Sequence, residues 1–160
     1  EWLNLIDAAQ SRLMHCLHQL SDEQLWQPPF PGGNSIANQL LHVCGNLRQW
    51  VIDGIRQSDS SRDRAAEFSA IGGLTKLDLT AAVIQTLEEV RVVLNEVPEE
   101  VVLAPRSIQG FRVTVLGAWA HSIPHLVGHT HQIVQITRML LADQYIFHWT
   151  PDGDRSAVPL

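Results

Sequence analysis

Three histidines recur at intervals of four residues in one largely apolar segment, at His121, His125 and His129. If the segment is helical, each step of four advances about 40° around the axis and about 6 Å along it, so the imidazoles form one row. Gln132 falls in about the same sector, whereas His131 lies away from the row and is expected to face solvent. Imidazoles at i and i+4 can bind one metal ion. Their nitrogens suit zinc, nickel, iron or copper better than magnesium or calcium.

A third ligand has to come from another segment, because two protein ligands rarely hold a metal ion. His42 is the candidate, since it shares a polar seam with Gln39, Asn46 and Gln49 beside the apolar stripe of its own segment. Packing the two segments together would bring their polar seams face to face. An alternative stays open: His42 lies near the edge of its apolar arc, and periodicity also permits a solvent-facing histidine at this position.

Other polar residues near the histidine row are candidates for roles around a metal. Asn46, Gln132 and Gln39 suit hydrogen bonds to the ligands or contacts with substrate, because ligating histidines usually donate their second ring N–H to an outer partner. His121 suits a proton shuttle, although a buried, hydrogen-bonded histidine is the simpler interpretation. No glutamate is adjacent to the row. Hydrolysis would therefore depend on a bound hydroxide or on a loop residue.

Four helical segments position these side chains and make up most of the sequence. Apolar residues at helical spacing predict them over about residues 2–20, 34–55, 75–97 and 115–142. His15 and His18, in the first segment, have no accompanying polar seam and are interpreted as surface residues. Long amphipathic helices without strand-like alternation favour an all-α four-helix bundle with long connecting loops. We expect one domain over residues 1–160, with an irregular tail at 149–160.

The connections between the helical segments carry their own signals. Ser21–Gln24 has the pattern of a capping box and predicts the start of a short turn. Residues 101–113, around Gln109-Gly110, predict a small hairpin or an extended loop. The polar stretch 58–73 separates the two halves of the chain. Its Arg62-Asp63-Arg64 run is interpreted as a solvated loop with local ion pairs.

Composition excludes several classes of protein. The 160 residues are 45% hydrophobic and carry 11 Lys+Arg against 17 Asp+Glu, a formal net charge of −6. Nucleic acid and anionic membrane surfaces are therefore unexpected partners. No apolar stretch approaches the roughly 20 residues that span a bilayer, and no secretory leader is evident. Cys16 and Cys44 lie within helical patterns and suit buried thiols better than a disulfide. We expect a reduced, cytoplasmic protein.

Taken together, these segments resemble the DinB-like superfamily of bacterial four-helix-bundle metalloproteins, which includes DinB- and YfiT-type proteins. The superfamily carries a histidine in its second helix and a later H-x-x-x-H-x-x-Q in its fourth, and the matching text here is Asn34–Asn46 and His125–Val134. Two further stretches, Leu20–Pro28 and Arg62–Phe68, resemble one uncharacterised branch of the superfamily. The similarity runs over most of the chain.

The resemblance implies that His42, His125 and His129 bind one divalent metal, with zinc expected first and nickel or iron as alternatives. His131 is not implied as a ligand, because relatives often have a small residue at this position. Characterised relatives include enzymes that activate a low-molecular-weight thiol for transfer or isomerisation. The resemblance therefore adds thiol transfer to the hydrolysis that a three-histidine site with open positions permits.

Two hypotheses of different classes follow. In the first, the chain is a metal-dependent enzyme, a hydrolase or a low-molecular-weight thiol transferase, acting on a small molecule of unspecified identity. In the second, it is a non-catalytic helical bundle whose metal site is vestigial or structural. A homodimer is expected in either case, because the helices carry apolar residues over wide arcs.

Overall fold

Helices dominate the computed structural model, which describes residues 1–148. The expected irregular tail at 149–160 lies outside the described residues. The long helices are α1 (Trp2–Gln19), α3 (Ile36–Leu47), α6 (Lys76–Glu96) and α7 (Val115–Leu141). Short helical elements are α2 (Asp22–Trp26), α4 (Gly54–Arg56), α5 (Arg64–Ser69), the π-helical η1 (Arg48–Asp53), and the 3-10 turns η2 (Glu99–Val101) and η3 (Ala142–Gln144).

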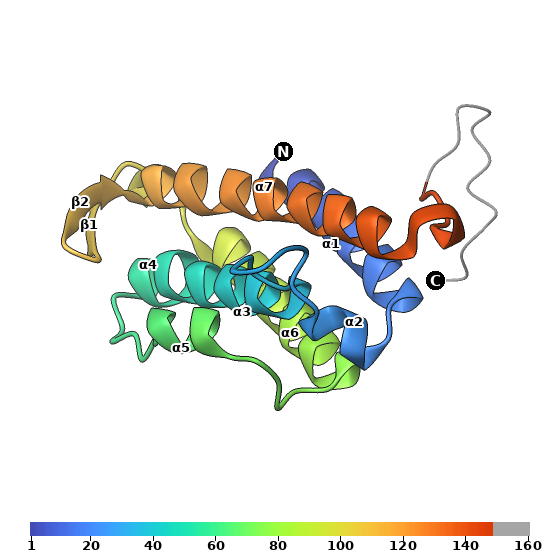
Figure 1. The fold of residues 1–160 in the computed structure, drawn as a ribbon. Coiled ribbons are helices and arrows are strands. Elements are labelled where there is room, and N and C mark those ends of the chain that lie inside the picture. The colour runs from blue at the N-terminus through green and yellow to red at the C-terminus, as the bar shows by residue number, and fades with distance from the viewer. Residues whose placement is uncertain (149–160) are drawn as a thin grey trace.

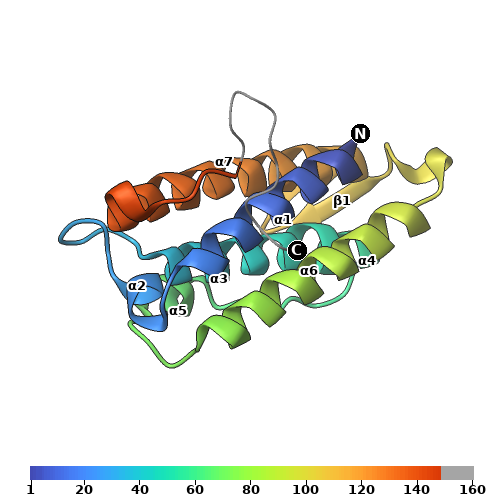
Figure 2. The same ribbon diagram turned by 90° about the vertical axis from the view of Figure 1, so that its right-hand side faces the viewer.

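The long helices pack so that each buries an apolar face. Helix α7 lies against α1 and α3, and α6 lies against the same two helices from the other side (Figures 1 and 2). Side chains from all four meet in one core, where the largest are almost fully buried, among them Ile6, Leu13, Leu40, Leu87 and Ile123. Among residues 1–148, no helix is both long enough and apolar enough to cross a membrane.

The helices begin where the sequence carries capping residues. Ser21, Ser35 and Thr75 each accept a hydrogen bond from the backbone N–H three residues on, and the side chain there bonds back to the cap. In the second long helix, predicted to begin at about residue 34, the cap is Ser35. Thr114 caps α7 in the same position but without the returning bond. These bonds confirm the helix starts, because each is made within four residues of sequence.

The segment predicted as one helix to residue 55 contains a π-helical stretch. Helix α3 ends at Leu47, η1 follows, and α4 ends at Arg56. The wider turn is evident in the bond from Gly54 N–H to the carbonyl of Gln49, five residues back. A π turn shifts the residues after it around the axis, so α4 does not continue the face that a uniform 3.6-residue period would predict.

A two-stranded hairpin joins α6 to α7. Strands β1 (Pro105–Ile108) and β2 (Phe111–Thr114) are antiparallel, and Ile108 pairs with Phe111 across the turn. The turn residues Gln109 and Gly110 have φ of 52° and 80°. Both positive angles are typical of a tight hairpin turn with glycine second, so the structure has the hairpin rather than the extended loop that the sequence also permitted. The hairpin lies at the end of the molecule where α7 begins (Figure 1).

The polar stretch 58–73 is more ordered than its composition predicts. It contains α5, which packs against α3 (Figure 1). The interpretation of Arg62-Asp63-Arg64 as a solvated loop is wrong for Arg62, whose side chain is only 5% exposed. Asp63 instead caps α5 by accepting from the N–H of Ala66. Arg62 is buried because it has a buried carboxylate to pair with.

Candidate metal centre

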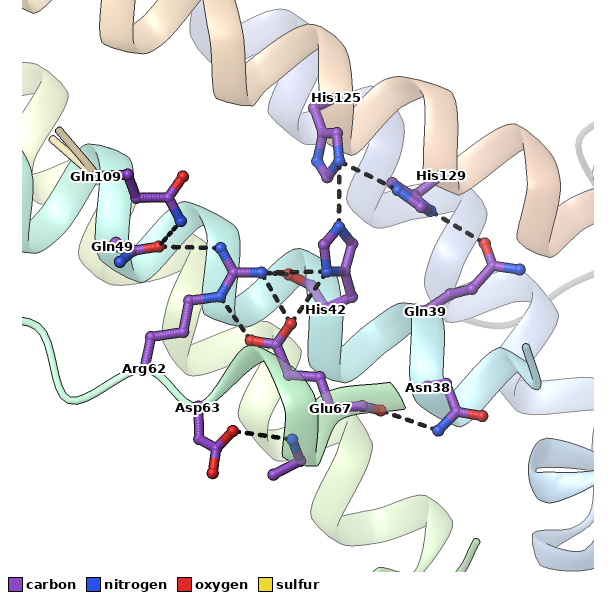
Figure 3. A network of polar contacts seen from close by, with 11 residues as sticks. Asn38, Gln39, His42, Gln49, Arg62, Asp63, Glu67, Gln109, His125 and His129 are labelled. Atoms are coloured by element: carbon purple, nitrogen blue, oxygen red, sulfur yellow. Dashed lines mark hydrogen bonds and ion pairs between the residues drawn. The ribbon is translucent and has the colours of Figure 1, made fainter. Parts of the chain in front are cut away.

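Three histidines from two helices converge between α3 and α7. His42 comes from α3, and His125 and His129 come from successive turns of α7 (Figure 3). His125 Nε2 lies 3.3 Å from His42 Nε2 and 3.2 Å from His129 Nε2. One ligand atom from each residue lies within 4.8 Å of the others. The structure thus brings together the three residues whose convergence the sequence could only suggest.

The spacing of the three nitrogens fits a metal ion. Two nitrogens about 2.0–2.1 Å from a zinc ion and about 109° apart lie about 3.3 Å from each other. Both Nε2 separations at His125 match that value. A hydrogen-bonded cluster fits less well, because His125 Nε2 can donate one proton to one neighbour only. The donor set is three imidazole nitrogens, which suits zinc, nickel or iron.

The outer nitrogen of His42 contacts a buried carboxylate. His42 Nδ1 lies 3.0 Å from Glu67 Oε2. A carboxylate only accepts, so the ring proton belongs on Nδ1 and the Nε2 lone pair faces the other histidines. Arg62 donates through Nε to Glu67 Oε1 at 2.6 Å and through Nη2 to Oε2 at 2.8 Å. The Nη2 of Arg62 also lies 3.1 Å from His42 Nδ1. Both of these nitrogens are donors, so we assign the Nη2 proton to the bond with Glu67.

His129 has a neutral outer partner instead. Its Nδ1 donates to Gln39 Oε1 at 3.1 Å. Gln132, three residues further along α7, acts on His129 by opposing part of the fall in its pKa. The predicted outer role of Gln39 therefore has a hydrogen bond to support it, and that of Gln132 stays a prediction. Two of the three histidines are thus oriented with Nε2 directed inward.

The environment keeps the three histidines neutral. Burial lowers the pKa of His125 to about 4, with the neighbouring His129 and His42 adding to the effect. Burial also lowers the pKa of His129, and His42 reinforces that shift while Gln132 opposes it. For His42, burial lowers the pKa most, the bond to Glu67 opposes it, and Arg62 lowers it further. Neutral imidazole is the form that binds a metal, so all three are ready ligands at pH 7.

A glycine allows Glu67 to reach His42. Gly45 lies one turn after His42 on α3, and a Cβ there would overlap Glu67 Oε1 and lie 2.9 Å from Arg62 Nε. Helix α5 is held at this position by Asn38, whose side-chain amide donates to the carbonyls of Glu67 and Ala70 at 2.9 and 2.8 Å. Two residues of α3, Gly45 and Asn38, therefore allow and hold the close approach of α5.

The remaining predicted site residues lie near the histidines without contacting their nitrogens. His121 is exposed and stacks on Trp50 at 4.0 Å between centroids, and its ring centre lies 6.1 Å from that of His125. Asn46 is buried, and within residues 1–148 its Oδ1 has no hydrogen-bond partner. The Nδ1 of His125 is likewise buried and unpartnered in that part of the chain. The shuttle role of His121 and the contact role of Asn46 stay predictions.

Two residues of the site were missed in the sequence. Glu67 and Arg62 lie in the segment interpreted as a polar connection, 25 and 20 positions after His42. Their signal was present only in the resemblance, as part of the Arg62–Phe68 stretch. His15 is also misplaced by the sequence interpretation: it is 4% exposed rather than a surface residue, because its ring bonds the chain after α7, whereas His18 is exposed as expected.

Comparison with known proteins gives a family and a fold. Residues 4–154 match a family described as "Protein of unknown function (DUF1572)". The chain is also similar to the crystal structure of a conserved protein of locus from Enterococcus faecalis, with a TM-score of 0.76 over 88% of this chain and 95% of that one. At 16% identity, this similarity shows the fold alone. No curated protein matches the chain.

Proposed function

Because the chain belongs to the DUF1572 family of proteins of unknown function, its activity has to be inferred from its site, and we propose that it is a metal-dependent enzyme of the DinB-like type. In this proposal the fold is a DinB-like four-helix bundle, and His42, His125 and His129 are the protein ligands of one divalent metal. The observation that carries the proposal is the convergence of three Nε2 atoms at zinc-like separations of 3.2 and 3.3 Å around His125.

The ligand count favours a catalytic site over a structural one. Structural zinc sites are closed by four protein ligands, whereas catalytic sites keep three and leave a position open. Three histidines form this group in the described part of the chain. Zinc is proposed as the metal, with nickel or iron as alternatives of similar ligand preference. When bound, the metal supplies a Lewis acid that can activate a water or hold a thiolate.

The surrounding residues favour thiol chemistry over hydrolysis. Efficient hydrolysis uses a base that accepts the proton of the attacking water. Within residues 1–148, Glu67 is the one carboxylate bonded to a ligand histidine, and His42 and Arg62 already occupy its oxygens. A thiol gives up its proton far more readily than water does, so a weak base such as an exposed histidine is enough for it. We therefore propose transfer of a low-molecular-weight thiol to a small acceptor, with metal-dependent hydrolysis second.

The chain's own residues suit that task. His42 and His129 are oriented by their outer bonds, so the site changes little when it is loaded. Exposed His121, one turn before His125, lies where it can accept the proton of an incoming thiol. In this scheme His121 is the proton acceptor and Trp50, on which it stacks at 4.0 Å, holds its ring.

The test combines metal analysis with a substrate panel. The purified protein is stripped with chelator, reloaded with zinc, nickel or iron(II), and assayed with small thiols plus an electrophilic acceptor, and separately with esters. We expect turnover only in the loaded protein, and loss of both metal and turnover in His129→Ala. His131→Ala, an exposed histidine on the same helix, is the matched control and should retain both.

Two results would contradict the proposal. A wild-type protein that takes up no transition metal in excess would remove its basis. A protein that binds metal without turning over any thiol or ester, and whose His129→Ala variant loses only thermal stability, would favour the non-catalytic alternative with a structural metal site.

A further inference from the structure

Glu67 and Arg62 form a buried ion pair beside the candidate metal site. The exposed fractions of the Arg62 and Glu67 side chains are 5% and 9%. Glu67 accepts three hydrogen bonds: two from Arg62 at 2.6 and 2.8 Å, and one from His42 at 3.0 Å. Burying two charges is costly, and replacing such a pair by apolar residues is often neutral or stabilising. The presence of this buried pair is therefore not explained by its contribution to the stability of the fold.

A comparable arginine–glutamate pair, Arg48 with Glu89, has no such surroundings. Arg48 bonds both oxygens of Glu89 at 2.9 and 3.1 Å, tying the start of η1 to α6. Its side chains are 41% and 30% exposed, and it contacts no histidine in the described residues. The hydrogen-bond geometry of the two pairs does not distinguish them. The pairs differ in the burial of their side chains and in the bond that Glu67 makes to His42.

The segment around Glu67 is arranged to bring its carboxylate to His42. Gly45 provides the space on α3, Asn38 bonds the carbonyl of Glu67, and the two oxygens of the carboxylate are fixed by Arg62. Arg62 is itself held, since its Nη1 donates to Gln49 Oε1 at 3.1 Å. The side chain of Gln109, in the hairpin turn, donates to the same Gln49 oxygen (Figure 3).

We propose that Glu67 and Arg62 are positioning residues for the metal ligand His42. Glu67 holds the ring proton on Nδ1 and so directs the Nε2 lone pair toward the cation. Arg62 fixes the carboxylate and neutralises its charge, which lets Glu67 remain buried. The inference rests on the proposed metal function and extends it to a segment 20 and more residues away from the ligand in sequence. Outer partners of ligating histidines typically contribute about 10–100-fold to metal affinity.

The principal test removes both charges at once. Loss of one partner would leave a buried unpaired charge and could unfold the protein. The double variant Arg62→Met/Glu67→Leu avoids this problem, and Arg48→Met/Glu89→Leu, which removes the pair between η1 and α6, is the matched control. Zinc affinity is measured by competition with a chromophoric chelator. We expect the first variant to bind zinc about 10–100-fold more weakly and the control to bind within about twofold of wild type.

A spectroscopic readout separates positioning from general stability. In the zinc-loaded wild type, ¹⁵N-labelled histidine should show a slowly exchanging Nδ1–H on His42, protected by the bond to Glu67. The control should retain this signal, and the Arg62→Met/Glu67→Leu variant should lose it while its helical circular dichroism is unchanged. If the pair served only to stabilise the fold, the Nδ1–H signal of His42 would be lost only together with the helical circular dichroism.

A single substitution on α3 perturbs the same bond between Glu67 and His42. Gly45→Ala leaves every charge in place but displaces Glu67, and we expect about tenfold weaker zinc binding. Gly128→Ala is its control, because a Cβ there meets nothing within 4 Å. Alanine favours a helix over glycine at both sites, so a purely local effect would stabilise both variants.

The outcomes distinguish the two proposals. If wild type binds no zinc, the proposed metal function fails and this inference fails with it. If wild type and the Arg48→Met/Glu89→Leu control bind zinc tightly and the Arg62→Met/Glu67→Leu variant binds equally well with the His42 signal intact, only the positioning role is overturned. Equal weakening in both double variants would also overturn it, by showing that the effect is one of general stability.

Discussion

Two groups of histidines in this molecule use their nitrogens in opposite ways. His42, His125 and His129, between α3 and α7, form the first group. In it, outer bonds engage Nδ1 of His42 and His129, and the Nε2 atoms converge. His15 and His148 form the second group, where α1 meets the chain after α7, with ring centres 5.1 Å apart. In the first group the histidine rings face one another. In the second group the histidines join α1 to the chain after α7.

The second group bonds through the nitrogen that the first leaves directed inward. His15 Nε2 lies 2.6 Å from the carbonyl oxygen of Ile146, and His148 Nε2 lies 2.9 Å from Ser11 Oγ. Gln19 bonds both the backbone N–H and the carbonyl of Ile146. His15 donates from Nε2 to this carbonyl, so it has no lone pair on that nitrogen for a cation. The bonds of His42 and His129 instead engage Nδ1 and leave Nε2 directed inward.

The largest expected effect is the loss of a proposed metal ligand from the first group. We expect His125→Ala to weaken zinc binding by more than about 100-fold, beyond what loss of an outer partner causes, because two ligands remain. The measurement is a chelator-competition titration with zinc. Stoichiometric, wild-type-like binding by this variant would mean that the two groups do not differ as described.

Acid should destabilise the metal-free protein through the first group. Folding lowers the pKa of His42, His125 and His129, in the case of His125 to about 4, below the ordinary value near 6.5. The unfolded chain therefore takes up protons first. The contribution of these residues to stability is fully present above about pH 6.5 and is lost as the pH falls toward 4.

This pH dependence is checked by urea unfolding of the metal-free protein between pH 7 and pH 4.5. We expect the free energy of unfolding to fall with pH, and the fall to be smaller in His125→Gln, which does not titrate. An identical slope in wild type and in the variant would show that folding does not shift the pKa of His125.

A smaller effect is expected from the neutral outer partner in the first group. Gln39 accepts from His129 Nδ1 at 3.1 Å, and water can replace an amide oxygen more easily than a buried carboxylate. We expect Gln39→Ala to weaken zinc binding by about tenfold, the lower end of the range for outer partners. Gln135→Ala, an exposed glutamine on α7, is the control and should leave the affinity unchanged. A greater loss in Gln39→Ala than in the Arg62→Met/Glu67→Leu variant would reverse the ranking.

The smallest effect on metal binding is expected from the second group. His15→Ala should leave zinc affinity at the wild-type value, while lowering the free energy of unfolding by about 1–3 kcal/mol through the lost bond to Ile146 and the space left by the ring. Urea unfolding and the zinc titration together measure both quantities. His18→Ala, at an exposed position on α1, should change stability by about 0.5 kcal/mol or less. A drop in zinc affinity in His15→Ala would show that the second group also contributes to metal binding, which contradicts the proposed difference between the groups.

Sequence reasoning predicted the four long helices, and gave the hairpin as one of two alternatives, because their signals are local. A cap such as Ser35 bonds Asn38 three residues on, and Gln109-Gly110 makes its turn within four residues. The π turn in η1 was not predicted, and its Trp50 packs with Ile108 of the hairpin and Ala118 of α7, which lie far away in sequence. Local patterns have no information about that contact.

The sequence by itself determined that His125 and His129 share one face, because one helical turn separates them and backbone geometry sets that relation. It also determined where the long helices start. Only the tertiary structure decided that His42 faces them, that Glu67 and Arg62 leave solvent to bond it, and that His15 instead holds the chain after α7. These contacts depend on the packing of helices far apart in sequence. A buried polar group has to form a hydrogen bond, and its partner is the group that the neighbouring element places beside it.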